Sequence, residues 1–204
     1  GPSCSGKTTL GRALTRILPN CRILNQDDYY KPDSEIPVDP ETGLDNWDTP
    51  AAVDFDQFIA AIDAARAINA STDQPPTWGT AQSYIPTPPI ERPQQGAAVD
   101  DGAVDERVLF ELRDALHSSY QAERFIVVDG FLLFADPRVA EHLDVRVFVT
   151  ASKTTLQRRR DARVGYTTVE GFWQDPPGYF DKIVWPNYVL HHHTLLELIG
   201  INGE

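Results

Sequence analysis

The spacing of apolar residues predicts helices that alternate with strands along most of the chain. Apolar positions that recur every three or four residues predict helices over 8–18, 53–70, 105–120, 137–142, 152–164 and 179–190. Pro186 is expected to kink the last helix, because proline cannot donate a backbone hydrogen bond. Short, continuous apolar runs predict buried strands over 21–25, 124–129 and 144–150. This alternation favours an α/β fold: a doubly wound parallel sheet with helices on both faces.

Two segments interrupt this pattern. Residues 71–104 are rich in proline and have little periodicity, which predicts an extended surface insertion. Residues 164–178 contain several glycines and prolines, and they are expected to form a loop that acts as a lid. The rest of the chain is long enough for one hydrophobic core, so residues 1–204 are interpreted as a single domain.

Charge and composition exclude several classes of partner. The net charge of -12 argues against a nucleic-acid surface, because a phosphate backbone would be repelled. No apolar run approaches the roughly 20 residues that span a bilayer, and no signal peptide is visible, so no membrane partner is expected. The two cysteines, Cys4 and Cys21, suit a reducing compartment. A cytoplasmic location is the default expectation, and no obligate protein partner is inferred.

The first residues of the chain carry the clearest chemistry. The segment Gly1-Pro2-Ser3-Cys4-Ser5-Gly6-Lys7-Thr8 matches every fixed position of the phosphate-binding loop G-x-x-x-x-G-K-[ST]. Lys7 is expected to reach the β- and γ-phosphates of a nucleotide. The strand that normally precedes such a loop is absent, so we expect the first strand of the sheet to be missing from the chain. The predicted nucleotide-binding residues here are Gly1, Ser3, Ser5, Gly6, Lys7, Thr8 and Thr9.

A carboxylate at the end of a buried strand points to a metal ion. Asp129 ends the apolar run 124–129, as in the strand that holds Mg²⁺ beside many phosphate loops. Thr8 and Asp129 are therefore the predicted Mg²⁺ ligands. In isolation, Asp129 could equally be a strand-end residue that begins a turn with Gly130.

Two further groups suit phosphoryl transfer to a hydroxyl. Asp27 and Asp28 follow the strand 21–25, and one of them could orient a hydroxyl and accept its proton. Arg158, Arg159 and Arg160, followed by Arg163, lie on a helix that leads into the lid, where arginines could neutralise a transferring phosphate. The alternatives are an acidic turn and a solvated basic face.

Several segments together resemble the nicotinamide riboside kinases. The similarity runs in the same order over most of the chain outside 71–104. The phosphate loop is generic to many kinases, whereas the Gln-Asp-Asp and Gly-Tyr-Phe-Asp segments are more specific. The segments that carry the resemblance are Gly1 to Thr9, Gln26 to Ile36, Gly130 to Phe134, Arg158 to Arg160 with Arg163, and Pro177 to Asp181.

The resemblance implies an activity and an assignment of residues. It implies that ATP, with Mg²⁺, phosphorylates the 5′-hydroxyl of nicotinamide riboside in NAD biosynthesis, with nicotinic acid riboside as a second candidate acceptor. Another nucleoside or sugar kinase, such as a uridine kinase, and a non-catalytic nucleotide-binding regulator are the alternatives. The lid is longer than in the shorter members of the family. The implied roles are base for Asp27, nucleotide contact for Arg159, lid arginine for Arg163, and substrate contacts for Tyr30, Trp47, Asp48, Arg160, Tyr166 and Asp175.

Overall fold

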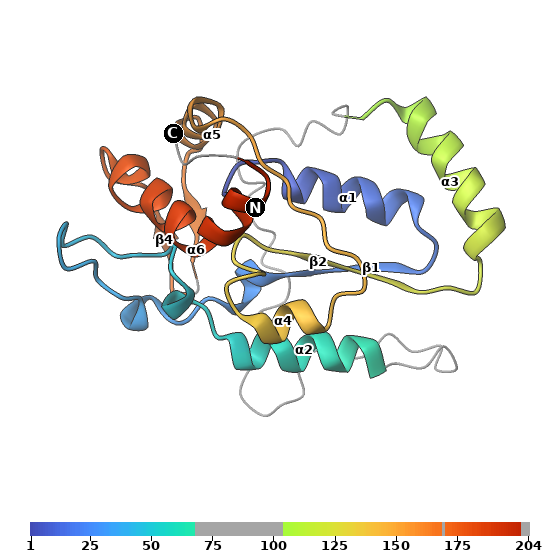
Figure 1. The fold of residues 1–204 in the computed structure, drawn as a ribbon, viewed down its shortest axis with the longest axis horizontal. Helices are drawn as coiled ribbons and strands as arrows, with labels where there is room; N and C mark the ends of the chain where they lie inside the picture. Colours follow the sequence, from blue (N-terminus) through green and yellow to red (C-terminus); the bar gives the residue numbers. More distant parts are fainter. Residues whose placement is uncertain (68–103, 169, 201–204) are drawn as a thin grey trace.

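A short parallel sheet lies at the centre of the protein. The computed structural model describes residues 1–67, 104–168 and 170–200 (Figure 1). Strand β1 (Cys21–Asn25) pairs in parallel with β2 (Phe125–Asp129), with Ile23 opposite Val127 and Asn25 opposite Asp129. The carboxyl ends of the two strands therefore meet at the same edge of the sheet, where ligands bind in open α/β folds.

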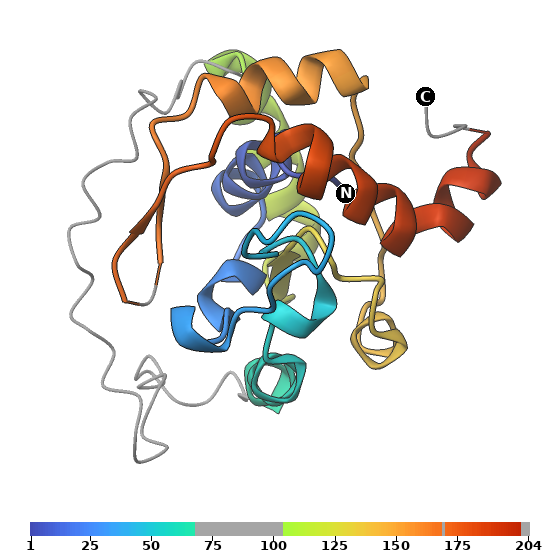
Figure 2. The same ribbon diagram turned by 90° about the vertical axis from the view of Figure 1, so that its left-hand side faces the viewer.

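Helices cover both faces of this sheet. Helix α1 (Lys7–Ile17) packs on one face, whereas α2 (Phe55–Ala67) and α4 (Pro137–Glu141) lie on the other (Figures 1 and 2). Helix α1 approaches closely because Gly11 has no side chain: a Cβ there would lie 2.8 Å from Ile23 Cδ1. Leu24 and Val128 face the α2 side, so both strands are apolar on both faces. The predicted parallel sheet within a mixed helix and strand fold is confirmed.

The remaining helices pack around this centre. Helix α3 (Glu106–Tyr120) lies against α1, and Asp105 caps it by accepting a hydrogen bond from the Arg107 amide. Helix α5 (Lys153–Asp161) begins at the predicted cap, Ser152, whose hydroxyl accepts from the Thr155 amide. Helix α6 (Trp185–Leu198) follows a π-helical turn, Phe180–Val184. The helices at 105–120, 137–142 and 152–164 are thus confirmed, with ends that differ by a few residues.

A π-helical turn lies just before Pro186, where the sequence predicts a kink. Proline has no amide hydrogen, and its ring clashes with the carbonyl four residues earlier in a regular α-helix. The wider turn over Phe180–Val184 comes directly before Trp185 and Pro186. Ile183 and Val184 are buried there in a hydrophobic cluster that also contains Trp47 and, from α5, Leu156.

One predicted strand and one predicted loop are wrong. Residues 144–150 form no strand, since β1 and β2 pair only with each other among the described residues, and Val145 is 80% exposed. A strand requires a hydrogen-bonded neighbour, which an apolar run does not supply by itself. The loop expected over 164–178 contains a hairpin, β3 (Tyr166–Thr167) with β4 (Phe172–Trp173). Its aromatic and β-branched residues favour strand geometry.

Two further predictions fall partly or wholly outside the described residues. The insertion predicted over 71–104 lies outside them except for its last residue. The last three residues of the helix predicted over 53–70 also lie outside them. Within the described residues, every helix is too short or too polar to cross a bilayer.

His192 on α6 makes the stability of the protein sensitive to acid. Burial lowers the pKa of His192 to about 4 from its ordinary value of 6.5. The unfolded chain therefore binds this proton before the folded protein does, and stability falls as the pH drops from 6.5 to about 4. Replacing His192 with phenylalanine keeps a ring between Phe148 and Tyr188 but removes the titrating group. Between pH 7 and pH 4.5, the free energy of unfolding of this variant should therefore fall by about 2 kcal/mol less than that of the unaltered protein. Urea unfolding of both proteins at pH 7 and pH 4.5 measures it; equal pH dependence would contradict the assignment.

Candidate active site

The phosphate loop has the backbone geometry of an anion site. Cys4 and Gly6 adopt left-handed conformations, with φ of 63° and 99°. Helix α1 begins directly after Gly6, and no side chain caps its first turn. An uncapped helix N-terminus offers backbone amides and the positive end of the helix dipole to an anion. Lys7 Nζ donates to Pro2 O at 2.6 Å, which holds the lysine side chain along the loop.

Thr8 and Asp129 meet at this loop. The Thr8 hydroxyl donates to Asp129 Oδ2 at 2.8 Å, although the two residues are 121 positions apart. No cluster of three or more metal-binding side chains occurs among the described residues. One hydroxyl and one carboxylate nevertheless fit Mg²⁺, which keeps several waters and takes its other ligands from substrate phosphates.

Asp27 interacts electrostatically with Lys7 of the phosphate loop. Asp27 belongs to a 3-10 turn, Gln26–Tyr29, that begins where β1 ends, so the geometry of this turn determines where its side chain points. The residue is exposed overall, yet desolvation by the protein around its carboxylate raises its pKa, and Asp129 and Asp28 raise it further. Lys7 opposes this shift. Burial lowers the pKa of Lys7, against the attraction of Asp27 and Asp129.

Arg160 forms a buried ion network with Asp48 and Asp175. Arg160 on α5 is 7% exposed, and its Nε and Nη2 donate to Asp175 at 2.5 and 3.2 Å. Its Nη1 lies 3.6 Å from Asp48 Oδ1. Burial raises the pKa of Asp48, and Arg160 opposes that shift. A buried arginine between two carboxylates gives this side of the site a fixed set of donors and acceptors.

Aromatic rings connect Asp27 to this network. The ring centroids of Tyr30 and Trp47 lie 5.4 Å apart, edge to face, and those of Tyr30 and Phe131 lie 6.0 Å apart. Burial raises the pKa of Tyr30, and the charges of Asp27 and Asp48 both add to the shift. Tyr30 therefore interacts electrostatically with both Asp27 and Asp48. The buried Trp47 Nε1 has no hydrogen-bond partner among the described residues.

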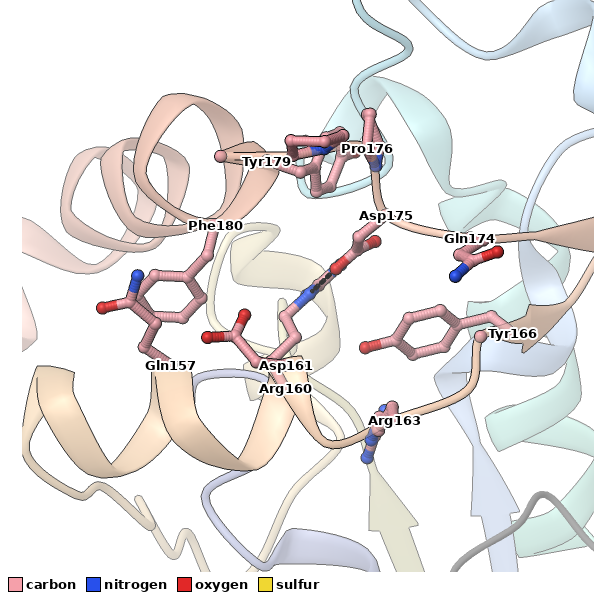
Figure 3. Close-up of a pocket in the computed structure, with 13 residues that line it drawn as sticks. Gln157, Arg160, Asp161, Arg163, Tyr166, Gln174, Asp175, Pro176, Tyr179 and Phe180 are labelled. Atoms are coloured by element: carbon pink, nitrogen blue, oxygen red, sulfur yellow. Dashed lines mark hydrogen bonds and ion pairs between the residues drawn. The ribbon is translucent and has the colours of Figure 1, made fainter.

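Arg159 on α5 contacts the phosphate loop, and Arg163, two residues after the end of α5, contacts the hairpin. Arg159 Nη1 donates to Cys4 O at 3.1 Å. The guanidinium of Arg163 lies 5.1 Å from the centre of the Tyr166 ring, and the charge of Arg163 acts on both Lys7 and Asp27. A cavity of about 270 Å³ opens beside these residues and is lined by Arg160, Arg163, Tyr166 and Asp175 among others (Figure 3).

The structure thus joins several of the predicted site residues by direct contacts: Thr8 with Asp129, Tyr30 with Trp47, Arg163 with Tyr166, and Arg160 with Asp48 and Asp175. Two aromatic residues at the site are absent from the predicted set: Phe131, which packs on Tyr30, and Trp173, which packs on Trp47. Phe131 comes two residues after Asp129, at the end of a predicted buried strand, and this position could have identified it as a residue near the site. Trp173 had no such signal, because its position depends on the fold of the hairpin.

Curated proteins similar to this chain carry one name. The chain is 35% identical over 197 residues to the nicotinamide riboside kinase of Eremothecium gossypii, which covers 96% of this chain and 74% of that protein. It is 32% identical over 204 residues to that of Schizosaccharomyces pombe, with 100% and 80% covered. It is 30% identical over 207 residues to nicotinamide riboside kinase 2 of Homo sapiens, with 100% and 71% covered. No protein-family model matches the chain. By its similarity to these relatives, the chain belongs to the nicotinamide riboside kinase family.

Proposed function

We propose that this protein transfers the γ-phosphoryl group of ATP to the 5′-hydroxyl of nicotinamide riboside, which yields nicotinamide mononucleotide for NAD biosynthesis. Membership of the family supports the substrate. The observation that carries the proposal is the electrostatic interaction of Asp27, a carboxylate with a raised pKa, with Lys7 of the phosphate loop. Phosphoryl transfer to a hydroxyl needs both a group that orients the hydroxyl and accepts its proton, and a cation that stabilises the transferring phosphate.

The donor half of the site is the phosphate loop with α1 and α5. The backbone amides around Gly6 bind the phosphates, and Lys7 and Arg163 neutralise charge on the transferring group. Ser3, Ser5, Thr9 and Arg159 complete the nucleotide contacts of this proposal. Thr8 and Asp129 would hold Mg²⁺, which would screen the negative charge of the β- and γ-phosphates.

Asp27 is the base in the acceptor half. Its carboxylate accepts the proton of the 5′-hydroxyl and aligns the oxygen with the γ-phosphorus. The raised pKa makes Asp27 a better proton acceptor than an ordinary aspartate, because proton affinity increases with pKa. Asp48 and Arg160 bind the ribose hydroxyls, since together they offer acceptors and donors within one buried pair.

The rest of the acceptor half suits a cationic ring. The nicotinamide ring of the riboside is a pyridinium, and aromatic faces with nearby carboxylates stabilise cations. Tyr30, Trp47 and Tyr166 supply aromatic rings, and Asp175 supplies a carboxylate. Nicotinic acid riboside shares this ring and is a second candidate acceptor.

The proposal includes the architecture of the whole enzyme. The sheet of β1 and β2 is the centre of a doubly wound kinase sheet, and residues 1–204 form a single domain. The segment 164–178, which includes β3 and β4, acts as the lid over the transferring phosphate.

The choice of acceptor tests the proposed function. The purified protein should convert nicotinamide riboside to its mononucleotide in the presence of ATP and Mg²⁺, with a much higher kcat/KM than for uridine. Chromatography and mass spectrometry of the products measure this, with nicotinic acid riboside and an acceptor-free sample in parallel. A preference for uridine would overturn the substrate. ATP hydrolysis without any phosphorylated acceptor would support the nucleotide-binding regulator instead.

A further inference from the structure

The β3–β4 hairpin is attached to the loop that carries Tyr30. Near the end of the hairpin, the Thr168 hydroxyl donates to Asp33 Oδ2 at 2.7 Å, and the Glu170 amide donates to Asp33 Oδ1 at 3.4 Å. Asp33 begins a short 3-10 turn three residues after Tyr30. These two hydrogen bonds hold the hairpin against the proposed acceptor half.

Within the hairpin, Trp173 contacts residues of that half directly. It lies opposite Tyr166 in the β3–β4 pair. The centroid of its ring lies 5.8 Å from that of Trp47 and 5.5 Å from that of Tyr179. Its indole Nε1 donates to Asp175 Oδ1 at 2.9 Å. The ring is therefore held on two sides, and its single donor is used by Asp175.

Asp175 in turn sets the orientation of Arg160. The Asp175 carboxylate accepts two hydrogen bonds from Arg160 (Figure 3). It accepts a third from the indole of Trp173. A paired carboxylate and guanidinium share a plane, so rotation of the carboxylate turns the guanidinium as well. The third nitrogen of Arg160 is the one that faces Asp48, at 3.6 Å. Trp173 is thus two hydrogen-bonded steps from the pair proposed to bind the ribose.

We propose that Trp173 is a positioning residue of the acceptor site. Its indole N–H holds the Asp175 carboxylate in the orientation that directs Arg160 toward Asp48. Without that donor the carboxylate keeps only its bonds to Arg160, and the buried pair can adopt more than one orientation. The inference rests on the proposed riboside kinase function.

The replacement Trp173→Phe tests this inference, because it keeps an aromatic ring and removes the N–H. We expect the KM for nicotinamide riboside to rise about tenfold, the usual effect of one lost hydrogen bond to a charged group. The KM for ATP and the melting temperature should stay close to those of the unaltered protein. Trp185→Phe is the matched control, because it makes the same chemical change on α6, outside the lid, where Trp185 packs on Phe180 and Tyr188. This control should leave both KM values unchanged.

A double-mutant cycle separates positioning from simple packing. If Trp173 acts through Asp175, Trp173→Phe should raise the riboside KM less than twofold further in an Asp175→Ala background. Full additivity, or a riboside KM within twofold of normal in Trp173→Phe alone, would overturn the inference. An unaltered protein that neither binds nor phosphorylates the riboside, by calorimetry and product assay, would instead overturn the proposed function.

Discussion

Replacing Asp27 with asparagine should lower kcat for riboside phosphorylation by about 10²- to 10⁴-fold, the usual contribution of a positioned general base. Asparagine keeps the size of the side chain but cannot accept the proton of the attacking hydroxyl. The ATP dissociation constant should change little, because the phosphate loop and α1 are unaltered. Steady-state kinetics and calorimetric titration of ATP measure the two quantities.

Asp28 supplies the control for this experiment. Asp28→Asn makes the same change of charge in the same 3-10 turn, whereas Asp27 is the carboxylate whose charge has the largest effect on the pKa of Lys7. It should reduce kcat less than tenfold, well below the range expected for a general base. Equal losses in the two variants would show that the charge of the turn matters, and that Asp27 is not the base.

Replacing Lys7 with methionine should lower kcat/KM by about 10²- to 10³-fold, because a charge that stabilises the transferring phosphoryl group is lost. Unlike the Asp27 variant, this protein should also bind ATP more weakly and lose any slow hydrolysis of ATP without acceptor. The two variants therefore divide the site into a donor half and an acceptor half. The same kinetic and calorimetric measurements apply.

Lys153→Met serves as the control for the loss of a lysine. Lys153 lies on α5 in an exposed ion pair with Asp181, and such pairs contribute little. Normal activity in this variant and a large loss in Lys7→Met would assign the effect to the phosphate loop. Unchanged ATP affinity in Lys7→Met would argue against its contact with the phosphates.

Local features of the chain were predictable because neighbouring residues are sufficient to form them. Strand β2 follows from a continuous apolar run, and the start of α5 follows from Ser152 and its bond to the next turn. The loop before α1 needs only its own glycines and the helix that follows. Thr8 and Asp129, which are 121 positions apart, could be predicted as ligands of one metal ion because each belongs to its own local motif, and their side chains meet at 2.8 Å.

Features that depend on distant partners could not be predicted in the same way. The apolar run at 144–150 resembles β2 in composition, yet it forms no strand, because a strand also requires a neighbouring strand to accept and donate hydrogen bonds. The hairpin at 166–173 was expected to be a loop. Each of its strands has only two residues, which is too short for a periodic pattern to appear.

The sequence by itself determined the nucleotide-binding loop, the order of most helices and strands, and the family to which the chain belongs. Only the tertiary structure decided how the acceptor half is built. It placed Arg160 between Asp48 and Asp175, and it brought Trp173 onto that pair. The physical reason is that a loop or a helix cap forms from contacts within a few residues, whereas a buried ion pair forms between segments that meet only after folding.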